Sequence, residues 1–207
     1  MILEACVDSL SQALSAQSQG AHRIELCSRL ELGGLSPDRD TILQALDMLR
    51  IPVKAMVRLR AGDFMYSEEE LSKMEQEILF CKSAGVKELV FGASLGSGRL
   101  DIPAIRRLAS VASPLSITIH KAIDLSPDPL ADLESLRTIE NVTHILSSGK
   151  EETALKGALL LREMIRASGE RFAIIAAGKV TRESLSLIHQ AIGATEYHGR
   201  LIVGPLG

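Results

Sequence analysis

Short apolar runs alternate with amphipathic stretches along the whole chain. Runs rich in valine, isoleucine and leucine are typical of buried strands, and apolar residues spaced three and four apart are typical of helices that pack on a sheet. We predict eight strands, over residues 2–7, 23–27, 53–58, 88–91, 116–120, 144–147, 172–176 and 195–198. Every gap between two strands is long enough for a crossover helix, which parallel strands require.

Helix start signals occupy these gaps. They are Ser36 with Pro37, Ser67, Asp101, Pro127 and Thr181, each just before an amphipathic stretch. Eight β-then-α units in 207 residues predict an α/β fold, the TIM (β/α)8 barrel, near its lower size limit. A doubly wound open sheet is the alternative. We favour the barrel because no unit carries a dinucleotide fingerprint: the glycines at 96 and 98 lack the third glycine.

The end of the chain departs from an ideal barrel. After His198 only residues 199–207 remain, too few for an ordinary eighth helix. We therefore expect that helix to be absent or truncated, which leaves one outer seam of the barrel without its usual cover. The apolar tail or a second subunit is expected to cover the seam.

Composition narrows the class of function. With 46% hydrophobic residues and no linker rich in proline or serine, we expect a single domain, 1–207, with one core. A formal charge of −3 with interspersed acids and bases, and 3% aromatic residues, argue against a nucleic-acid or membrane surface. Three cysteines without a paired framework indicate reduced thiols, and the lack of a leader or a membrane-length apolar run predicts a cytoplasmic protein.

Polar chemistry follows the third predicted strand. Alternation directs Arg58 and Arg60 to the same face, and Asp63 adds a carboxylate in the next turn. Two guanidinium groups on one face of an interior strand need anions to meet them, from the protein or from a ligand.

A Glu-apolar-Cys triplet occurs in each of the first two predicted strands, ending at Cys6 and Cys27. The apolar positions of both strands suit the helix-facing side, so Glu4, Glu25 and the two cysteines are expected to point into the barrel. Neighbouring strands lie about 4.8 Å apart, so the two thiols can approach one ion.

The same alternation turns further polar side chains inward. In later strands these are Thr118, His120, Glu196 and His198, and Lys121 and Asp124 follow on the next loop. Together with the residues above they form a constellation at the carboxyl ends of the strands, where barrel enzymes assemble their sites.

A charge-balanced interior is the competing explanation for Glu4 and Glu196, because structural ion pairs resemble sites. Cys6 and Cys27 can equally be small interior residues, and Cys81 is interpreted as core filler. The remaining histidines, His22, His144 and His189, are interpreted as hydrogen-bonded core residues.

Two loops, residues 147–150 and 176–181, each place glycine and lysine between a strand and a helix start. That geometry is suited to binding phosphate. Ordinary turn chemistry explains the same glycines, and we favour this second interpretation.

The sequence resembles the CutC family of copper homeostasis proteins. The matching segments, in order, are GAHRIELCS (20–28), GGLSP (33–37), VRLRAGDFMYS (57–67), VFGA (90–93), IHKAID (119–124), SSG (147–149) and GATEYH (193–198). The resemblance implies a TIM barrel, a cytoplasmic location, self-association as a homodimer or higher homo-oligomer, and copper handling centred on the segments that carry Cys6 and Cys27. Lys121 departs from the arginine that is usual in the family, and Leu59 and Ala61 stand where proline and glycine are common.

Two functions remain as hypotheses. In the first, which we prefer, Cys6 and Cys27 hold Cu(I), a soft ion that favours thiolates. In the second, the protein is a barrel enzyme acting on a small anionic or sugar-like substrate, with catalytic acid and base groups among Glu25, His120 and Glu196. Its predicted substrate-binding residues are Arg58, Arg60, Asp63, Lys121, Asp124 and His198.

Overall fold

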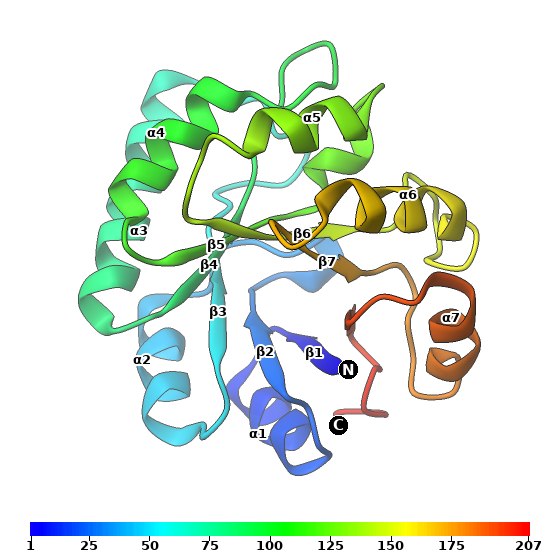
Figure 1. Cartoon of the computed structure of the whole chain (residues 1–207). Helices are drawn as coiled ribbons and strands as arrows, with labels where there is room; N and C mark the ends of the chain where they lie inside the picture. The colour runs from blue at the N-terminus through cyan, green and yellow to red at the C-terminus, as the bar shows by residue number, and fades with distance from the viewer.

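The computed structural model describes residues 1–207 and contains a closed barrel of parallel strands arranged in sequence order (Figure 1). The eight strands are β1 (Ile2–Val7), β2 (Arg23–Leu26), β3 (Val53–Met56), β4 (Glu88–Phe91), β5 (Ser116–Ile119), β6 (Val142–Ser147), β7 (Ala173–Ala176) and β8 (Glu196–Gly199). The α-helices are α1 (Leu10–Ser18), α2 (Arg39–Met48), α3 (Glu68–Ala84), α4 (Ile102–Ala112), α5 (Pro129–Leu136), α6 (Ala158–Ser168) and α7 (Leu185–Ile192). Two 3-10 helices, η1 (Leu30–Leu32) and η2 (Lys121–Leu125), follow β2 and β5. The predicted TIM barrel with a missing eighth helix is confirmed.

The third strand is shorter than the alternation predicts, and this difference matters for the site. β3 ends at Met56, whereas the prediction ran to Arg58. Beyond Met56 the chain joins the loop after β2: the Arg58 backbone N–H donates to Ser36 Oγ at 2.9 Å, and the Ser36 N–H donates to the Arg58 carbonyl at 2.8 Å. The regular alternation of side chains therefore stops before Arg60.

Two of the predicted helix starts are confirmed. Ser67 accepts from the Glu70 N–H while Glu70 reaches back to the Ser67 N–H, a complete capping box, and Asp101 accepts from the Ala104 N–H. The other starts lie further along the chain: α2 and α5 begin after Asp38 and Asp128, which cap them, and α7 begins after Ser184. In each case the predicted start residue lies before the residue at the N-cap position of the helix.

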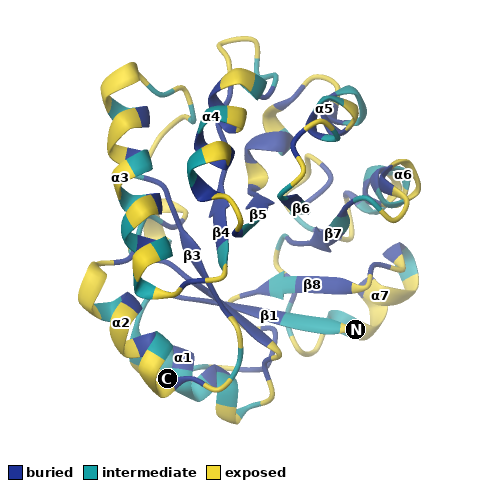
Figure 2. Cartoon of the chain, turned by 60° about the vertical axis from the view of Figure 1, so that its left-hand side comes forward, coloured by how far each residue is buried: buried dark blue, intermediate teal, exposed yellow.

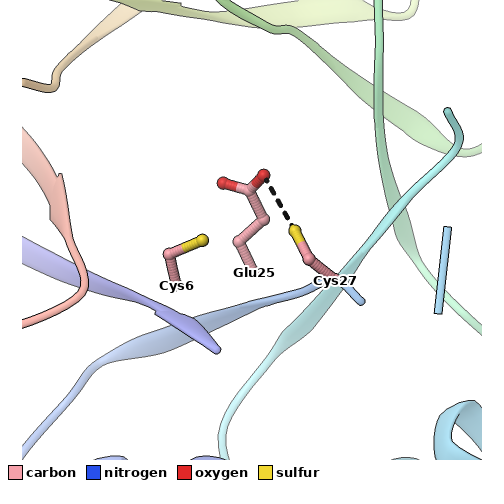
Figure 3. Close-up of side chains that lie close together, drawn as sticks. All are labelled: Cys6, Glu25 and Cys27. Carbon is pink, nitrogen blue, oxygen red and sulfur yellow. Dashed lines mark hydrogen bonds between the residues drawn. The ribbon is translucent and has the colours of Figure 1, made fainter. Parts of the chain in front are cut away.

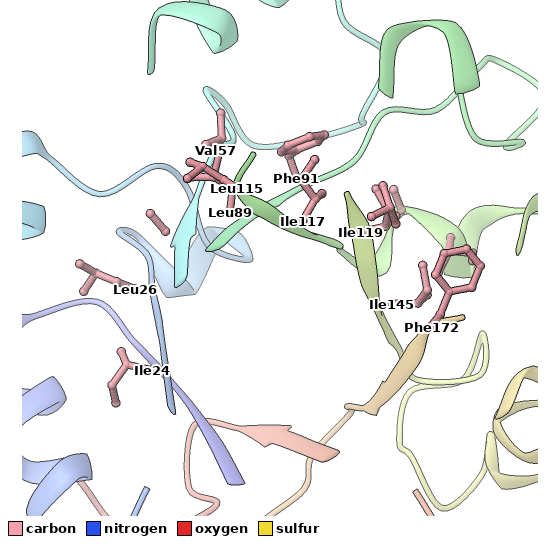
Figure 4. Close-up of a cluster of buried hydrophobic side chains, with 14 of the residues drawn as sticks. Ile24, Leu26, Val57, Leu89, Phe91, Leu115, Ile117, Ile119, Ile145 and Phe172 are labelled. Atoms are coloured by element: carbon pink, nitrogen blue, oxygen red, sulfur yellow. The ribbon is translucent and has the colours of Figure 1, made fainter. Parts of the chain in front are cut away.

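The apolar side chains lie between the barrel and its helices. Ile24, Leu26, Leu89, Phe91 and Ile117 point outward from the strands into this layer (Figure 4), and burial follows the same division along each helix (Figure 2). An all-parallel sheet buries both faces, so the barrel interior must be filled as well. That interior is where the polar residues of the strands lie.

The tail covers the seam left by the missing helix. Ile202 and Val203 are buried, and the Gln19 side chain from the end of α1 donates to the Pro205 carbonyl at 2.7 Å. Arg182, just before α7, donates to the Val203 carbonyl at 3.5 Å. The tail therefore bridges the first and last helices. None of the helices has the length and apolar character needed to cross a membrane.

Five charged residues form an interior ion network on the amino-terminal side of the barrel: Glu4, Arg23, Lys54, Glu88 and Glu196. Arg23 lies 2.5 Å from Glu4 and 2.5 Å from Glu196. Lys54 Nζ lies 3.3 Å from Glu4 Oε2 and 3.4 Å from Glu88 Oε2, and it donates to Thr118 Oγ1 at 2.7 Å. Ion pairs thus fill this part of the interior, and their cations are Arg23 and Lys54.

We expect Lys54→Met to lower the free energy of unfolding by about 3–5 kcal/mol, because the change removes a fully buried cation that lies between Glu4 and Glu88. Urea denaturation followed by circular dichroism measures this difference. Lys73→Met is the matched control: Lys73 is exposed and pairs with Glu69 on the same helix, so its loss should cost less than about 1 kcal/mol. Equal stabilities of the two variants would show that the interior network contributes little.

Candidate functional site

A cavity of about 110 Å³ opens at the carboxyl-terminal end of the barrel, above the interior ion network. Its lining comes from strands on both sides of the barrel and from the loops that follow them: Cys6, Glu25, Cys27, Gly33, Met56, Arg58, Phe64, His120, Lys121, Leu146 and His198. The barrel closure brings these distant segments together, as the predicted constellation requires.

Cys6, Glu25 and Cys27 form the wall of the cavity on the β1–β2 side. Cys6 stands directly across from Glu25 in the strand register, and Cys27 follows at the end of β2. The Cys27 thiol donates to Glu25 Oε1 at 3.6 Å, and one ligand atom from each of the three residues lies within 4.8 Å of the others (Figure 3). The two sulfurs point into the same space, with the carboxyl group between them.

His198 joins this wall to the ion network below. Its Nδ1 hydrogen-bonds Glu4 Oε1 at 2.9 Å and lies 3.0 Å from Glu25 Oε2. Burial disfavours the imidazolium, but Glu25, Cys6 and Glu4 together raise the pKa of His198 well above its usual value. His198 is therefore a cation at neutral pH, placed beside the thiol of Cys6.

The two cysteines and Glu25 have unequal proton affinities. A hydrogen bond to Cys27, and contact with His198, lower the pKa of Cys6 to about 6 despite its burial. The same interaction with Cys6, together with burial, raises the pKa of Cys27 well above its usual value. Burial raises the pKa of Glu25 to about 8. At neutral pH the wall thus holds one thiolate, one thiol and one neutral carboxyl group.

Arg58 and His120, which follow β3 and β5, line another part of the cavity. Four backbone carbonyls hold the Arg58 guanidinium, which lies over the Phe64 ring at 4.8 Å. The His120 ring lies 4.4 Å from the Phe64 ring, and burial followed by the charge of Arg58 lowers the pKa of His120 to about 3. His120 is therefore neutral at physiological pH. Lys121 follows at the rim with its side chain 44% exposed.

Four of the predicted site residues do not reach the cavity. Arg60 was expected beside Arg58, but the end of β3 turns it to the surface, where it pairs with Glu70 at 2.5 Å and Asp63 at 3.0 Å. Asp63 is also exposed. Glu196 begins β8 at the amino-terminal end, where Arg23 and His144 lie against it; although burial opposes ionisation, these contacts lower its pKa to about 2.

Asp124, the fourth of these residues, closes a loop. It accepts hydrogen bonds from Ser147 Oγ at 2.5 Å, from the N–H and hydroxyl of Ser148 at 2.9 Å, and from the Lys150 N–H at 3.2 Å. These donors belong to the 147–150 loop, whose geometry was suited to binding phosphate. The carboxylate of Asp124 takes the place of a bound anion there. In the loop at 176–181, Lys179 pairs with Glu152.

Arg23 and Lys54, the cations of the ion network, were not among the predicted site residues. Their signal was present in the alternation: Arg23 stands two residues before Glu25 and Lys54 two residues before Met56, so both share the inward face. Phe64, which lies against both Arg58 and His120, was missed as well because it lies on a loop with no regular periodicity.

Comparisons with known proteins agree on the family. A family model described as the CutC family matches residues 1–203. The human copper homeostasis protein cutC homolog is 38% identical over 197 residues, covering 95% of this chain and 72% of the human protein. A family protein CutC from Mesorhizobium japonicum is 35% identical, covering 95% of this chain and 76% of its own length.

Among solved structures, CutC from Streptococcus agalactiae superposes with a TM-score of 0.93 at 28% identity, covering 98% of this chain and 99% of that one. Dihydrodipicolinate synthase from Bacillus anthracis superposes with a TM-score of 0.66 at 13% identity, covering 98% of this chain and 70% of the enzyme. The second likeness shows the barrel fold alone.

We expect the thiolate of Cys6 to be visible by its ultraviolet absorbance near neutral pH and to disappear as the pH falls through about 6. Cys27 and Cys81 should not contribute, because their pKa values are raised, that of Cys81 to about 12. His198→Gln removes the neighbouring cation and should move the midpoint upward. Cys6→Ser is the control that abolishes the signal, and a wild-type midpoint at the ordinary value for a free thiol would contradict the assignment.

Proposed function

This chain belongs to the CutC family, and we propose that it acts in copper homeostasis by binding Cu(I) between the thiols of Cys6 and Cys27. Two features support the proposal: the sulfurs face one cavity, and their ligand atoms lie within 4.8 Å of each other and of Glu25. Cu(I) is a soft ion, for which thiolates are preferred ligands. Copper is the cargo of this site, bound and later released.

The protonation states of the Cys6 and Cys27 thiols suit the binding of one monovalent ion. Cys6 supplies a thiolate before the ion arrives, and Cys27 must lose its proton to become the second ligand. A Cu(I) ion with two thiolates carries one net negative charge. The imidazolium of His198 lies beside Cys6 and can balance that charge.

A second group, Glu4, Glu25 and His198, also has ligand atoms within 4.8 Å of one another. Two of its members are already engaged: Glu4 is held by Arg23 and Lys54, and His198 hydrogen-bonds Glu4. An ion there would have to replace buried ion pairs at a large cost. The sulfur pair is therefore the better copper site, with Glu25 as the nearest oxygen.

Catalysis on a small anionic or sugar-like substrate is the second candidate function, favoured by one observation. The pKa values of Cys6 and Glu25 are shifted in opposite directions, so a thiolate and a neutral carboxyl group lie side by side on one wall of the cavity at neutral pH. In this function Glu25 is the acid and Cys6 the base. Glu196 and His120 are poorly suited to proton transfer, because the first stays ionised and the second neutral.

Copper binding is tested by titrating Cu(I) against a competing chelator. We expect one ion per chain in the wild type and a loss of affinity of at least about 100-fold in the Cys6→Ser, Cys27→Ser double variant, because both thiolate ligands are gone. Affinity should rise with pH, about tenfold per unit between about pH 6 and the raised pKa of Cys27, since binding displaces one proton.

Cys81→Ser is the matched control for this experiment, because Cys81 is buried in α3 away from the cavity and should leave copper affinity unchanged. Full affinity in the double variant, or an affinity that does not depend on pH, would refute the proposed ligands.

We further propose a cytoplasmic, self-associating protein. All three cysteines are free thiols, which suits a reducing compartment. Four exposed leucines belong to the neighbouring helices α6 and α7 and the segments beside them: Leu155, Leu159, Leu187 and Leu201. Exposed apolar residues grouped in this way support a contact between subunits.

Sedimentation velocity tests the self-association. We expect a species larger than the 22.3 kDa chain, and a shift to the monomer in the Leu159→Glu, Leu187→Glu double variant, because charges would then enter the apolar contact. Leu43→Glu on α2 is the control, since Leu43 is exposed to a similar degree on another side of the barrel (Figure 1). A wild-type monomer at every concentration would exclude self-association.

A further inference from the structure

Polar atoms without partners gather at the cavity. Arg58 Nε and His120 Nε2 are buried and donate no hydrogen bond within the protein, and both residues line the same space of about 110 Å³. Nearly all buried polar groups in folded proteins are hydrogen-bonded. Leaving two donors unsatisfied around one small cavity is costly unless a ligand meets them.

Arg58 is a buried cation without a counter-ion. Its Nη1 donates to the carbonyls of Leu32, Gly33 and Gly34 at 3.4, 3.2 and 3.1 Å, and its Nη2 donates to the carbonyl of Gly62 at 3.0 Å. Every other buried arginine or lysine of the barrel interior pairs with a glutamate, whereas Arg58 forms no ion pair. These carbonyls hold the guanidinium in one orientation and leave its Nε–H and its positive charge unmatched.

His120 supplies a neutral donor next to this charge. Its Nδ1 accepts from the Ala122 N–H at 3.2 Å, so in the neutral ring the proton is on Nε2, the atom without a partner. Phe64 contacts both His120 and Arg58, which places the two side chains around one ring. Two N–H donors without partners and one positive charge thus belong to residues that line the cavity.

We infer that this cavity binds the carboxylate of a small organic acid, with its oxygens accepting hydrogen bonds from Arg58 Nε and His120 Nε2. One unmatched positive charge calls for a monoanion, and two separate donors match the two oxygens of a carboxylate. The available volume corresponds to roughly four water molecules, so the acid has only a few non-hydrogen atoms.

An entry path leads to the same place. Lys121 and His198 line both this cavity and an adjoining outer cleft of about 490 Å³, whose lining includes Lys179 and Arg200. Cations at the mouth of a cleft attract anions and raise their local concentration. The acid site lies apart from the copper ligands: Arg58 and His120 belong to neither group of residues that could hold a metal ion.

Isothermal titration of the purified protein with formate, acetate, glycolate and pyruvate tests this inference. We expect saturable one-to-one binding of at least one of these acids, and none of acetamide, chloride or inorganic phosphate at matched ionic strength. Arg58→Met should weaken binding at least about tenfold, because a charge-assisted hydrogen bond is lost. Arg60→Met is the matched control, since Arg60 is the neighbouring arginine but pairs outside the cavity.

His120→Phe is the second variant, in case Arg58→Met disturbs the loops that Arg58 holds. It removes the Nε2 donor, keeps a ring against Phe64, and should also weaken acid binding. The Cys6→Ser, Cys27→Ser double variant should bind the acid as the wild type does, which separates this site from the copper proposal. No saturable binding of any acid, equal binding of chloride or phosphate, or unchanged binding in correctly folded Arg58→Met and His120→Phe variants would overturn the inference.

Discussion

Glu4 lies at the centre of the closed barrel without contact with solvent, and three cationic side chains surround it: Arg23, Lys54 and His198. Burial opposes its ionisation, yet these neighbours hold the pKa of Glu4 well below the usual value. Glu4 stays ionised because the neighbouring positions on β2, β3 and β8 carry cations. The polar interior of the barrel depends on this balance.

Ion pairing is complete on one side of Glu4 and incomplete on the other. Toward the amino ends of the strands, each of three glutamates lies within 3.4 Å of Arg23 or Lys54. Toward the carboxyl ends, Glu25 has no cation of its own and shares His198 with Glu4. Burial and the lack of its own cation raise the pKa of Glu25. For the same reason His198 can stabilise a thiolate at Cys6. The reactive groups lie where the structural pairing ends.

The fold could be predicted from the sequence because its signals are local and repeated. All eight strands were predicted, with ends within two residues of those observed, since each is a short apolar run between polar turns. The expected inward direction of Glu4, Cys6, Glu25 and Cys27 also agrees with the structure, because strand alternation is a strict period of two.

The residues of the site were predicted less well, because several of the residues concerned lie on loops beyond the ends of the strands. Arg60 follows the point where β3 leaves the sheet, so alternation no longer governs its direction, and the nearby carboxylate of Glu70 captures it instead. Asp124 binds loop donors that only the folded chain brings to it. Phe64 reaches the cavity from a loop with no periodicity. These placements depend on contacts between distant segments, which no local pattern encodes.

The two walls of the cavity present different chemistry, and this bears on how copper and a small acid can share one barrel. Cys6 and Cys27 come from β1 and the end of β2, whereas Arg58 and His120 follow β3 and β5, so soft and hard donors line different parts of one cavity. A Cu(I) ion held by two thiolates is anionic and is balanced by His198. It makes no use of Arg58, whose charge would remain buried and unmatched in a protein that binds copper alone. A separate anion on the Arg58 wall removes that difficulty, which is why we regard the copper site as one half of the cavity.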